Sequence, residues 1–144
     1  MADTLLVGVD GSEGGTRAAK FASKRAKESG ARLVVAYVIE WSPYTFNTPQ
    51  ENEQRHKRRE EEITRAESEV IQPLVSAMKG EGIDAEGVVR HGHAAEVLSQ
   101  LAREHKAGQI FIGRLGMSKL KAMLFGSVAG SLVQVSPVPV TVIP

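Results

Sequence analysis

The sequence predicts a single-domain α/β protein in which residues 1–144 form a doubly wound, five-stranded parallel sheet with helices on both faces. Three observations predict this class. Short apolar segments alternate with longer stretches of helical periodicity along the whole chain. The apolar segments are mostly continuous runs, as expected for parallel strands that are buried on both faces. A chain of 144 residues suits one domain, and no repeat or linker divides it.

The first part of the chain predicts a strand, a helix and a second strand. An apolar run at residues 5–9 ends in Asp10-Gly11-Ser12, which is a turn and helix-start signal. The helix that follows carries basic residues on one face and alanines on the other, and Gly30 suits its C-terminal end. A second strand is expected at residues 33–39. Residues 40–50 break the periodicity and are expected to form a loop.

The middle of the chain predicts a long helix and a third strand. Apolar residues in segment 51–79 have helical spacing, and the segment begins with a dense run of charges at residues 53–62. The mixed signs of this run favour a solvated helix face over a nucleic-acid-binding patch. Pro73 is expected to kink or interrupt the helix, because proline lacks a backbone N–H. A third strand is expected at residues 85–90, followed by a turn at His91-Gly92-His93.

The last part of the chain completes the alternation. An amphipathic helix follows the third strand, and a fourth strand is expected at residues 110–112. A glycine-bearing loop then extends from Gly113 to Gly126. Ser127 is a natural N-cap for the next helix. A closing strand is expected from Val138 to Ile143.

Composition narrows the classes of function. The net charge is +1 and aromatic residues make up 5% of the chain, so no nucleic-acid partner is expected. The chain has no cysteine, which excludes disulfides, thiolate nucleophiles and thiolate-bound metals. No apolar run is long enough to span a membrane, and no signal peptide is evident. The expected location is therefore the cytoplasm.

Two loops are expected to meet at a binding site. In a doubly wound sheet, ligands bind beyond the carboxyl ends of the strands, where the strand order reverses. This places the turn Asp10-Gly11-Ser12 beside the loop that starts at Gly113. Glycines let the backbone approach an anion, the helix start at Ser127 adds free N–H groups, and Arg114 adds positive charge. Together these features predict a cradle for a di- or triphosphate.

Several residues of the site have alternative roles. The loop is not a P-loop, because no G-x-x-x-x-G-K-S/T is present, and no G-x-G-x-x-G follows the first strand. Asp10 could instead satisfy backbone N–H groups of its own turn. Ser12 suits a helix N-cap better than a nucleophile, because no base can be assigned near it. His91 and His93 lack a third ligand, so no metal site is expected.

The glycine loop carries a resemblance to a known family. It matches the pattern G-x₂-G-x₉-G-S/T in full, with residues Gly113, Gly116, Gly126 and Ser127. In this pattern the chain resembles the ATP-binding branch of the universal stress protein family. Residues 7–12 are similar to the family's opening strand and acidic turn, and residues 33–38 to its second strand. Residues 139–143 are similar to its closing strand, so the likeness covers nearly the whole chain.

The resemblance implies a Rossmann-like sheet of the adenine nucleotide alpha-hydrolase-like kind that binds ATP, with Mg²⁺ accompanying the nucleotide. It implies that Asp10 bonds the nucleoside and that Val38 lines the adenine pocket. It also implies a homodimer formed through the strand from Val138 to Ile143. The implied nucleotide-binding residues are Val9, Asp10, Gly11, Ser12, Val38, Gly113, Arg114, Gly116, Gly126, Ser127 and Val128.

The leading hypothesis is an ATP-binding regulatory protein of the stress response. Hydrolysis or autophosphorylation is expected to be slow at most, because the sequence offers no base for the attacking water and only Arg114 as a loose candidate for an arginine finger. No catalytic residue is assigned. Two rival hypotheses stay open. One is a dimeric interaction module of the same fold that binds no nucleotide, and the other is a true phosphotransferase or hydrolase.

Overall fold

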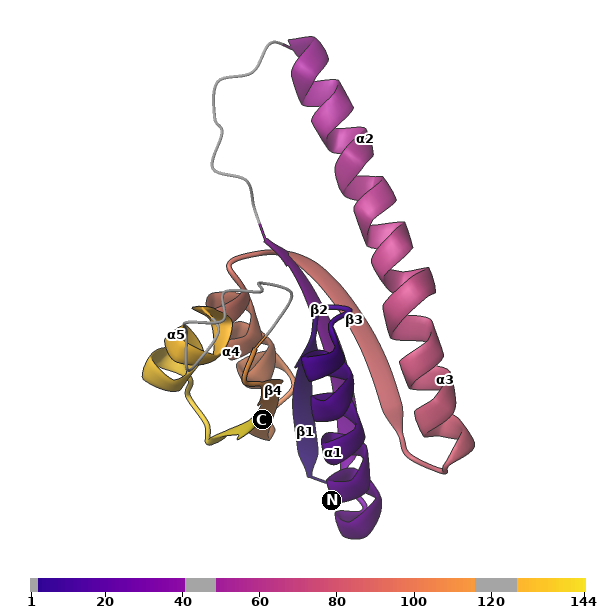
Figure 1. Ribbon diagram of the computed structural model, residues 1–144, viewed down its shortest axis with the longest axis vertical. Coiled ribbons are helices and arrows are strands. Elements are labelled where there is room, and N and C mark those ends of the chain that lie inside the picture. Colours follow the sequence, from indigo (N-terminus) through magenta and orange to yellow (C-terminus); the bar gives the residue numbers. More distant parts are fainter. Residues whose placement is uncertain (1–2, 41–48, 116–126) are drawn as a thin grey trace.

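The computed structural model describes residues 3–40, 49–115 and 127–144, in which strands and helices alternate (Figure 1). In chain order the elements are β1 Thr4–Val9, α1 Glu13–Ser29, β2 Arg32–Glu40, α2 Pro49–Ala66, the π-helical segment η1 Glu67–Ile71, α3 Gln72–Gly80, β3 Ala85–Gly92, α4 Ala94–Glu104, β4 Ala107–Gly113, α5 Ser127–Val135 and β5 Val140–Ile143.

The strands form one parallel sheet in the order β3-β2-β1-β4-β5. The chain first builds outward from the central strand β1 through β2 to β3. It then returns to the other side of β1 and adds β4 and β5. The strand order therefore reverses between β1 and β4, and the loops that leave these two strands diverge to opposite faces. The predicted five-stranded, doubly wound α/β fold is confirmed.

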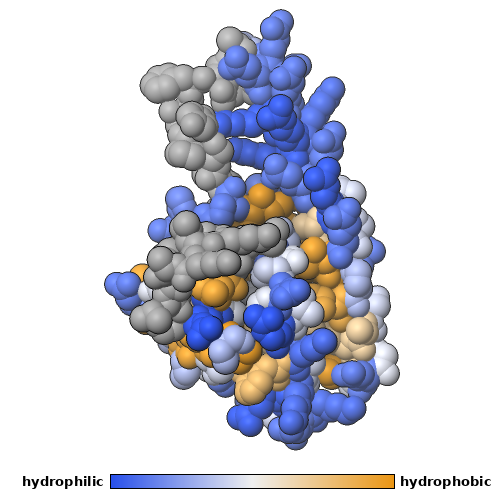
Figure 2. All heavy atoms as spheres, viewed as in Figure 1, coloured by the Kyte–Doolittle hydropathy of each residue, from blue (hydrophilic) through white to orange (hydrophobic). Residues whose placement is uncertain are grey.

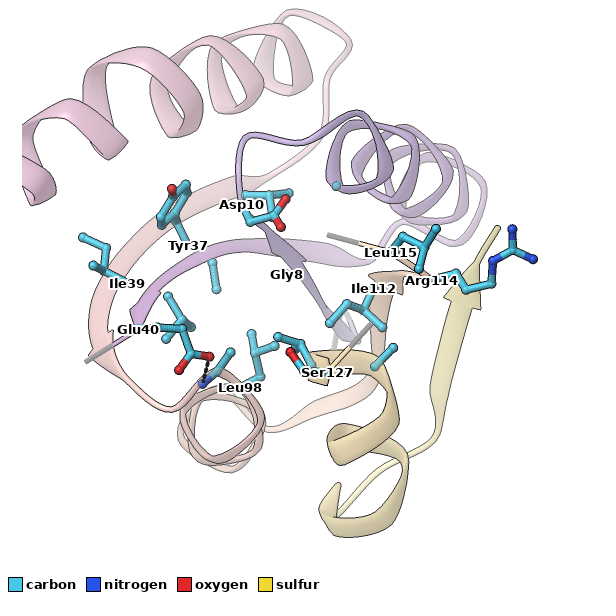
Figure 3. Close-up of a pocket in the computed structure, with 18 residues that line it drawn as sticks. Gly8, Asp10, Tyr37, Ile39, Glu40, Leu98, Ile112, Arg114, Leu115 and Ser127 are labelled. Atoms are coloured by element: carbon cyan, nitrogen blue, oxygen red, sulfur yellow. Dashed lines mark hydrogen bonds between the residues drawn. The ribbon is translucent and has the colours of Figure 1, made fainter. Parts of the chain in front are cut away.

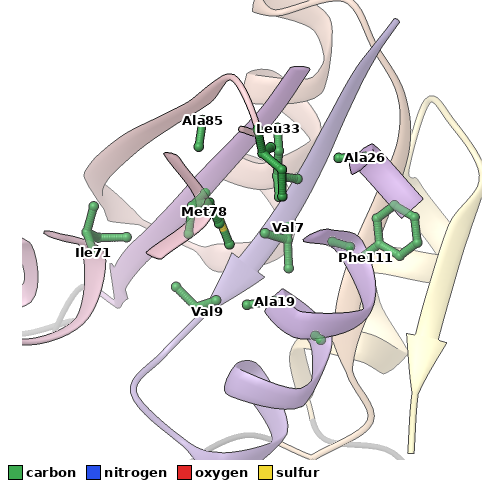
Figure 4. Close-up of a cluster of buried hydrophobic side chains, with 13 residues drawn as sticks. Val7, Val9, Ala19, Ala26, Leu33, Ile71, Met78, Ala85 and Phe111 are labelled. Carbon is green, nitrogen blue, oxygen red and sulfur yellow. The ribbon is translucent and has the colours of Figure 1, made fainter. Parts of the chain in front are cut away.

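Each face of the sheet buries its own apolar core. Under α1, η1 and α3 the largest buried side chains include Leu33, Val35 and Phe111 (Figure 4). Under α4 and α5 they include Leu98 and Leu132. The buried face of α1 consists mainly of alanines and glycines, so this helix packs very close to the strands.

The carboxyl edge of the sheet extends further than the sequence predicts. The turn predicted at His91-Gly92-His93 is wrong for its first two residues, which belong to β3. There His91 pairs with Ile39, and Gly92 pairs with Glu40, the last residue of β2. The physical reason is that β2 itself continues through Glu40, so the ladder has a partner for two more residues of β3. Only His93 remains between β3 and α4.

The predicted loop at residues 40–50 is shorter at both ends. Glu40 belongs to β2, and α2 already begins at Pro49, a residue type that suits the first turn of a helix. The rest of the predicted loop lies outside the described residues. At the other end of the chain, β5 begins at Val140, although the carbonyl of Pro139 already accepts a hydrogen bond from the Ile110 N–H at 2.9 Å.

Pro73 interrupts the long helix, as predicted. It lies in the first turn of α3, and the π-helical segment η1 directly precedes that turn. Within this junction the Gln72 N–H donates to the Glu67 carbonyl five residues earlier, which is the wide turn of a π-helix. The wider π-helical turn makes room for the pyrrolidine ring of Pro73, which would clash with a carbonyl of the preceding turn in a regular α-helix.

Helix α2 extends beyond the sheet and carries the predicted charge run (Figures 1 and 2). Most of its described side chains are exposed, including Glu53, Arg58 and Glu61. This agrees with the solvated helix face that mixed charges predict. Across residues 3–40, 49–115 and 127–144, no helix is both long enough and apolar enough to cross a membrane.

The end of β4 lies directly against the first turn of α1. A Cβ atom placed on Gly113 would come within 2.8 Å of both the carbonyl carbon and the carbonyl oxygen of Gly14. Gly14 and Gly15 are themselves buried in the first turn of α1. Because backbone on both sides forms this contact, no flexible side chain can move aside for a larger residue.

We therefore expect Gly113→Ala to lower the free energy of unfolding by about 1–3 kcal/mol, the usual cost of overpacking. The matched control is Gly108→Ala on the same strand, because a Cβ at Gly108 meets no atom within 4 Å. That variant should stay within about 0.5 kcal/mol of the wild type. Urea denaturation of the three proteins measures the difference. Equal stability of both variants would contradict the close packing of β4 on α1.

Candidate functional site

A pocket of about 300 Å³ opens at the carboxyl edge of the sheet (Figure 3). It lies at the ends of β1, β2 and β4, and the N-terminal parts of α1, α4 and α5 complete its walls. The described residues that line it are Gly8, Val9, Asp10, Gly15, Ala36, Tyr37, Val38, Ile39, Glu40, Ala94, Leu98, Ile112, Gly113, Arg114, Leu115, Ser127, Val128 and Ala129. Its volume is at the lower end of the range for small-molecule sites.

The turn after β1 places Asp10 at the pocket wall. The Asp10 carboxylate accepts hydrogen bonds from the Ser12 N–H at 3.0 Å and from the Ser12 hydroxyl. The Ser12 oxygen in turn accepts from the Gly15 N–H at 3.1 Å and so caps α1. Asp10 therefore satisfies a backbone N–H of its own turn, which was the alternative role, and it also lines the pocket. Ser12 is the N-cap of α1, as the sequence predicts. Both bonds hold the carboxylate in a fixed orientation.

Gly11 and Ser12 shape this turn but do not line the pocket. Gly11 has a φ of +82°, a conformation that side chains disfavour. A Cβ there would lie 3.5 Å from a methyl of Val70 in η1, which is ordinary van der Waals contact, so the backbone conformation alone favours glycine here. The structure thus separates the predicted first loop into two parts. Val9 and Asp10 face the pocket, and Gly11 and Ser12 support them.

The loop after β4 forms the opposite wall. Gly113, Arg114 and Leu115 line the pocket, and the Arg114 N–H donates to the Ile143 carbonyl at 2.7 Å. This bond extends the pairing of β4 with β5 by one residue beyond Gly113. Two further glycines of the predicted motif, Gly116 and Gly126, lie outside the described residues.

Helix α5 brings its first turn to the pocket through Ser127, Val128 and Ala129. The sequence predicts Ser127 as the N-cap of this helix. The described part of α5 starts at Ser127, and the residues before it lie outside the described ranges, so the cap stays a prediction. The first turn of any helix has N–H groups without partners in the helix, and the helix dipole makes this end positive. This end of α5 therefore gives the pocket a wall whose electrostatics suit an anionic group.

The end of β2 and the neighbouring helix α4 form an apolar wall, of which the sequence predicts only Val38. Val38 lines the pocket as predicted, and Ile39 and Leu98 line it as well. Leu98 also packs closely on Gly8 of β1. A Cβ atom on Gly8 would lie 3.1 Å from a Leu98 methyl, which is tighter than an ordinary contact. No local pattern marks Leu98 as a pocket residue, since its spacing only shows that it belongs to the buried face of α4.

Glu40 and Gly15 are two further pocket residues that the sequence analysis missed. The Glu40 carboxylate accepts a hydrogen bond from the Ala94 N–H at 3.1 Å and so caps α4 from a neighbouring strand (Figure 3). Only the tertiary structure reveals this contact. Gly15 had a local signal, because two consecutive glycines in the first turn of a helix are unfavourable without a packing reason.

Negative charge dominates the electrostatics near β1 and β2. Burial raises the pKa of the Tyr37 phenol, and the negative charges of Asp10 and Glu62 raise it further. The phenol therefore stays neutral and can donate a hydrogen bond at physiological pH. Among the described lining residues, the charged ones are Asp10, Glu40 and Arg114. Ligand groups that donate hydrogen bonds suit the two carboxylates, and anionic groups suit the side of Arg114 and α5.

The two predicted loop histidines lie in different surroundings. His91 is on β3 with its side chain 15% exposed, and its Nε2 atom is 3.8 Å from the Glu62 carboxylate. His93 is exposed, and its Nδ1 atom is 3.7 Å from the Glu40 carboxylate. In the part of the chain that the structure describes, no group of three or more histidine and carboxylate side chains could hold a metal ion.

Comparisons with known proteins agree with this architecture. The model of the universal stress protein family matches residues 1–144. A universal stress protein of Thermus aquaticus, from the QAH/OAS sulfhydrylase 3′ region, is 31% identical over 144 residues and is covered to 99%, as is this chain. Among solved structures, UspA of Lactobacillus plantarum superposes with a TM-score of 0.88 at 21% identity, over 99% of this chain and 97% of that one.

A second solved structure, a universal stress protein in complex with cAMP, superposes with a TM-score of 0.64 at 26% identity. The match covers 99% of this chain and 96% of that chain. The sequence comparisons and the fold agree, and the chain belongs to the universal stress protein family.

Proposed function

We propose that this protein binds ATP in the pocket and acts as a nucleotide-dependent regulatory protein. The observation that carries the proposal is that residues predicted from two distant loops line one pocket. Its described lining includes the predicted residues Val9, Asp10, Val38, Gly113, Arg114, Ser127 and Val128. One end of this pocket is apolar, and the other lies beside a positive side chain and a helix N-terminus. An adenine nucleotide has the same division into an apolar base and an anionic phosphate chain.

The base is proposed to lie against Val38, Ile39 and Leu98, where the wall is apolar. The phosphates are proposed to lie near Arg114 and the start of α5, where the helix dipole and free N–H groups favour anions. The motif glycines Gly116 and Gly126 support this placement by sequence alone. A relative solved with cAMP supports the class of ligand, since cAMP is an adenine nucleotide.

Mg²⁺ is proposed to accompany the phosphates. The described residues offer no cluster of three ligands for a metal, but Mg²⁺ commonly uses one or two carboxylates with phosphate oxygens and water. Asp10 lines the pocket and directly follows β1, the strand next to β4. The donor set therefore fits an ion that the nucleotide itself brings.

Any hydrolysis or autophosphorylation is proposed to be slow. No histidine or lysine is among the described pocket residues. The Asp10 carboxylate is oriented by Ser12 and is proposed to face Mg²⁺, so it is not assigned as a base for water. Arg114 offers charge for a transition state, but no group is placed to activate water. A regulatory role in the cytoplasm, in which nucleotide binding changes the state of the protein, fits these residues better than steady turnover.

The glycine motif gives a direct test. We expect Gly116→Val and Gly126→Val to abolish detectable ATP binding in a calorimetric titration, because a branched side chain blocks close approach of the phosphates to the backbone. Gly130→Ala in α5 is the control, since a Cβ there meets no atom within 4 Å. Circular dichroism checks that each variant is folded. Unchanged affinity in folded Gly116→Val and Gly126→Val proteins would contradict the phosphate cradle.

We also propose a homodimer through the closing strand from Val138 to Ile143. β5 is an edge strand that pairs with β4 on one side, and its apolar residues are only half-buried. Such an edge favours pairing with another strand. Pro139 limits the ladder to the residues after it, because it has no N–H.

Sedimentation equilibrium measures the mass of the protein in solution and so tests the dimer directly. We expect a mass of about 31 kDa, twice the 15.5 kDa of one chain. A mass of 15.5 kDa at all concentrations up to about 100 μM, which exceeds the Kd of a stable homodimer, would contradict the dimer.

A further inference from the structure

Glu40 stands at one end of the pocket, opposite Arg114 (Figure 3). It is the last residue of β2, and its carboxylate is tied to the start of α4 by the bond from the Ala94 N–H at 3.1 Å. The side chain of His93, the residue before α4, makes no capping bond. Glu40 therefore takes over the cap, and this bond fixes where its carboxylate points.

The cap uses only part of the bonding capacity of Glu40. One carboxylate oxygen, Oε1, accepts from Ala94, whereas Oε2 is 3.7 Å from the His93 ring and beyond hydrogen-bond distance of it. A carboxylate has about four acceptor positions. The side chain is 56% exposed, so a ligand can reach the free oxygen.

The surroundings of this oxygen make it selective. Among the neighbouring pocket residues, Val38, Ile39 and Leu98 offer no side-chain hydrogen bonds, and Tyr37 offers a neutral phenol. Glu40 is thus the charged acceptor at the apolar end of the described pocket. An ionised carboxylate accepts hydrogen bonds and donates none, and it repels phosphate and carbonyl oxygens.

We propose that Glu40 accepts a hydrogen bond from the 6-amino group of the bound base and thereby selects 6-aminopurine nucleotides. This inference rests on the proposed function, which places the base at this end and the phosphates near Arg114. Adenine carries an N–H₂ donor at C6, whereas guanine and hypoxanthine carry a carbonyl oxygen there. A base held with C6 toward Glu40 is attracted in the first case and repelled in the second.

The test compares ATP with purine riboside 5′-triphosphate, which differs from ATP only by lacking the 6-amino group. Calorimetry gives the Kd of both ligands for the wild type, Glu40→Gln and the control Glu96→Gln. Glutamine keeps an oxygen for the Ala94 N–H, so α4 stays capped, but it can present an N–H₂ donor to the ligand. Glu96 is an exposed acid in the first turn of the same helix and does not line the pocket.

We expect the wild type to bind ATP about tenfold more tightly than the analogue, a typical value for one hydrogen bond to a charged group. The ratio should fall to about one in Glu40→Gln and stay near tenfold in Glu96→Gln. Removal of the Glu40 charge also lessens repulsion of the triphosphate, which raises the affinity of both ligands alike. The ratio within each protein is therefore the measured quantity.

Three results would overturn this role of Glu40 while ATP binding itself stands. They are a ratio near one in the wild type, a tenfold ratio that survives in Glu40→Gln, and tighter binding of GTP than of ATP. If the wild type binds none of the triphosphates, the proposed function fails and the inference fails with it.

Discussion

Backbone meets backbone where the end of β4 passes the first turn of α1, and the pocket depends on this contact. Gly113 and Gly14 come so close that a single Cβ on Gly113 would overlap the Gly14 carbonyl. The contact joins the two loops that leave the sheet where its strand order reverses. Asp10 and Arg114, which are 104 positions apart in the chain, therefore line the same pocket. Without glycine at this point, the loops could not approach as closely.

The charged groups of the pocket are also divided between its two sides, with the carboxylates on one and Arg114 on the other. Its carboxylates belong to the ends of β1 and β2, whereas Arg114 and the first turn of α5 lie beside the end of β4. Asp10 is held by Ser12, and Glu40 is held by the Ala94 N–H, so both acids are oriented before any ligand binds. Preorganised groups of this kind lower the entropic cost of binding. A ligand with donors at one end and negative charge at the other fits this pattern.

Local patterns in the sequence were sufficient for the order of the elements and for part of the pocket. Continuous apolar runs located the strands, and the glycine motif located the loop after β4, from which Gly113 and Arg114 line the pocket. The end of β3 was misplaced because the pairing of His91 with Ile39 depends on the length of another strand. Glu40 was missed for a similar reason, since its partner Ala94 is distant in sequence. Strand register and contacts between elements arise only from tertiary packing.

The ligand content of the native protein is the decisive test of nucleotide binding. The protein would be purified without added nucleotide and denatured, and the released small molecules would be identified by chromatography and mass spectrometry. We expect an adenine nucleotide, or, if the protein is isolated empty, saturable binding of added ATP with one site per chain. A protein that carries no nucleotide and also fails to bind ATP in calorimetry would contradict it. A dimeric interaction module of the same fold would then be the better description.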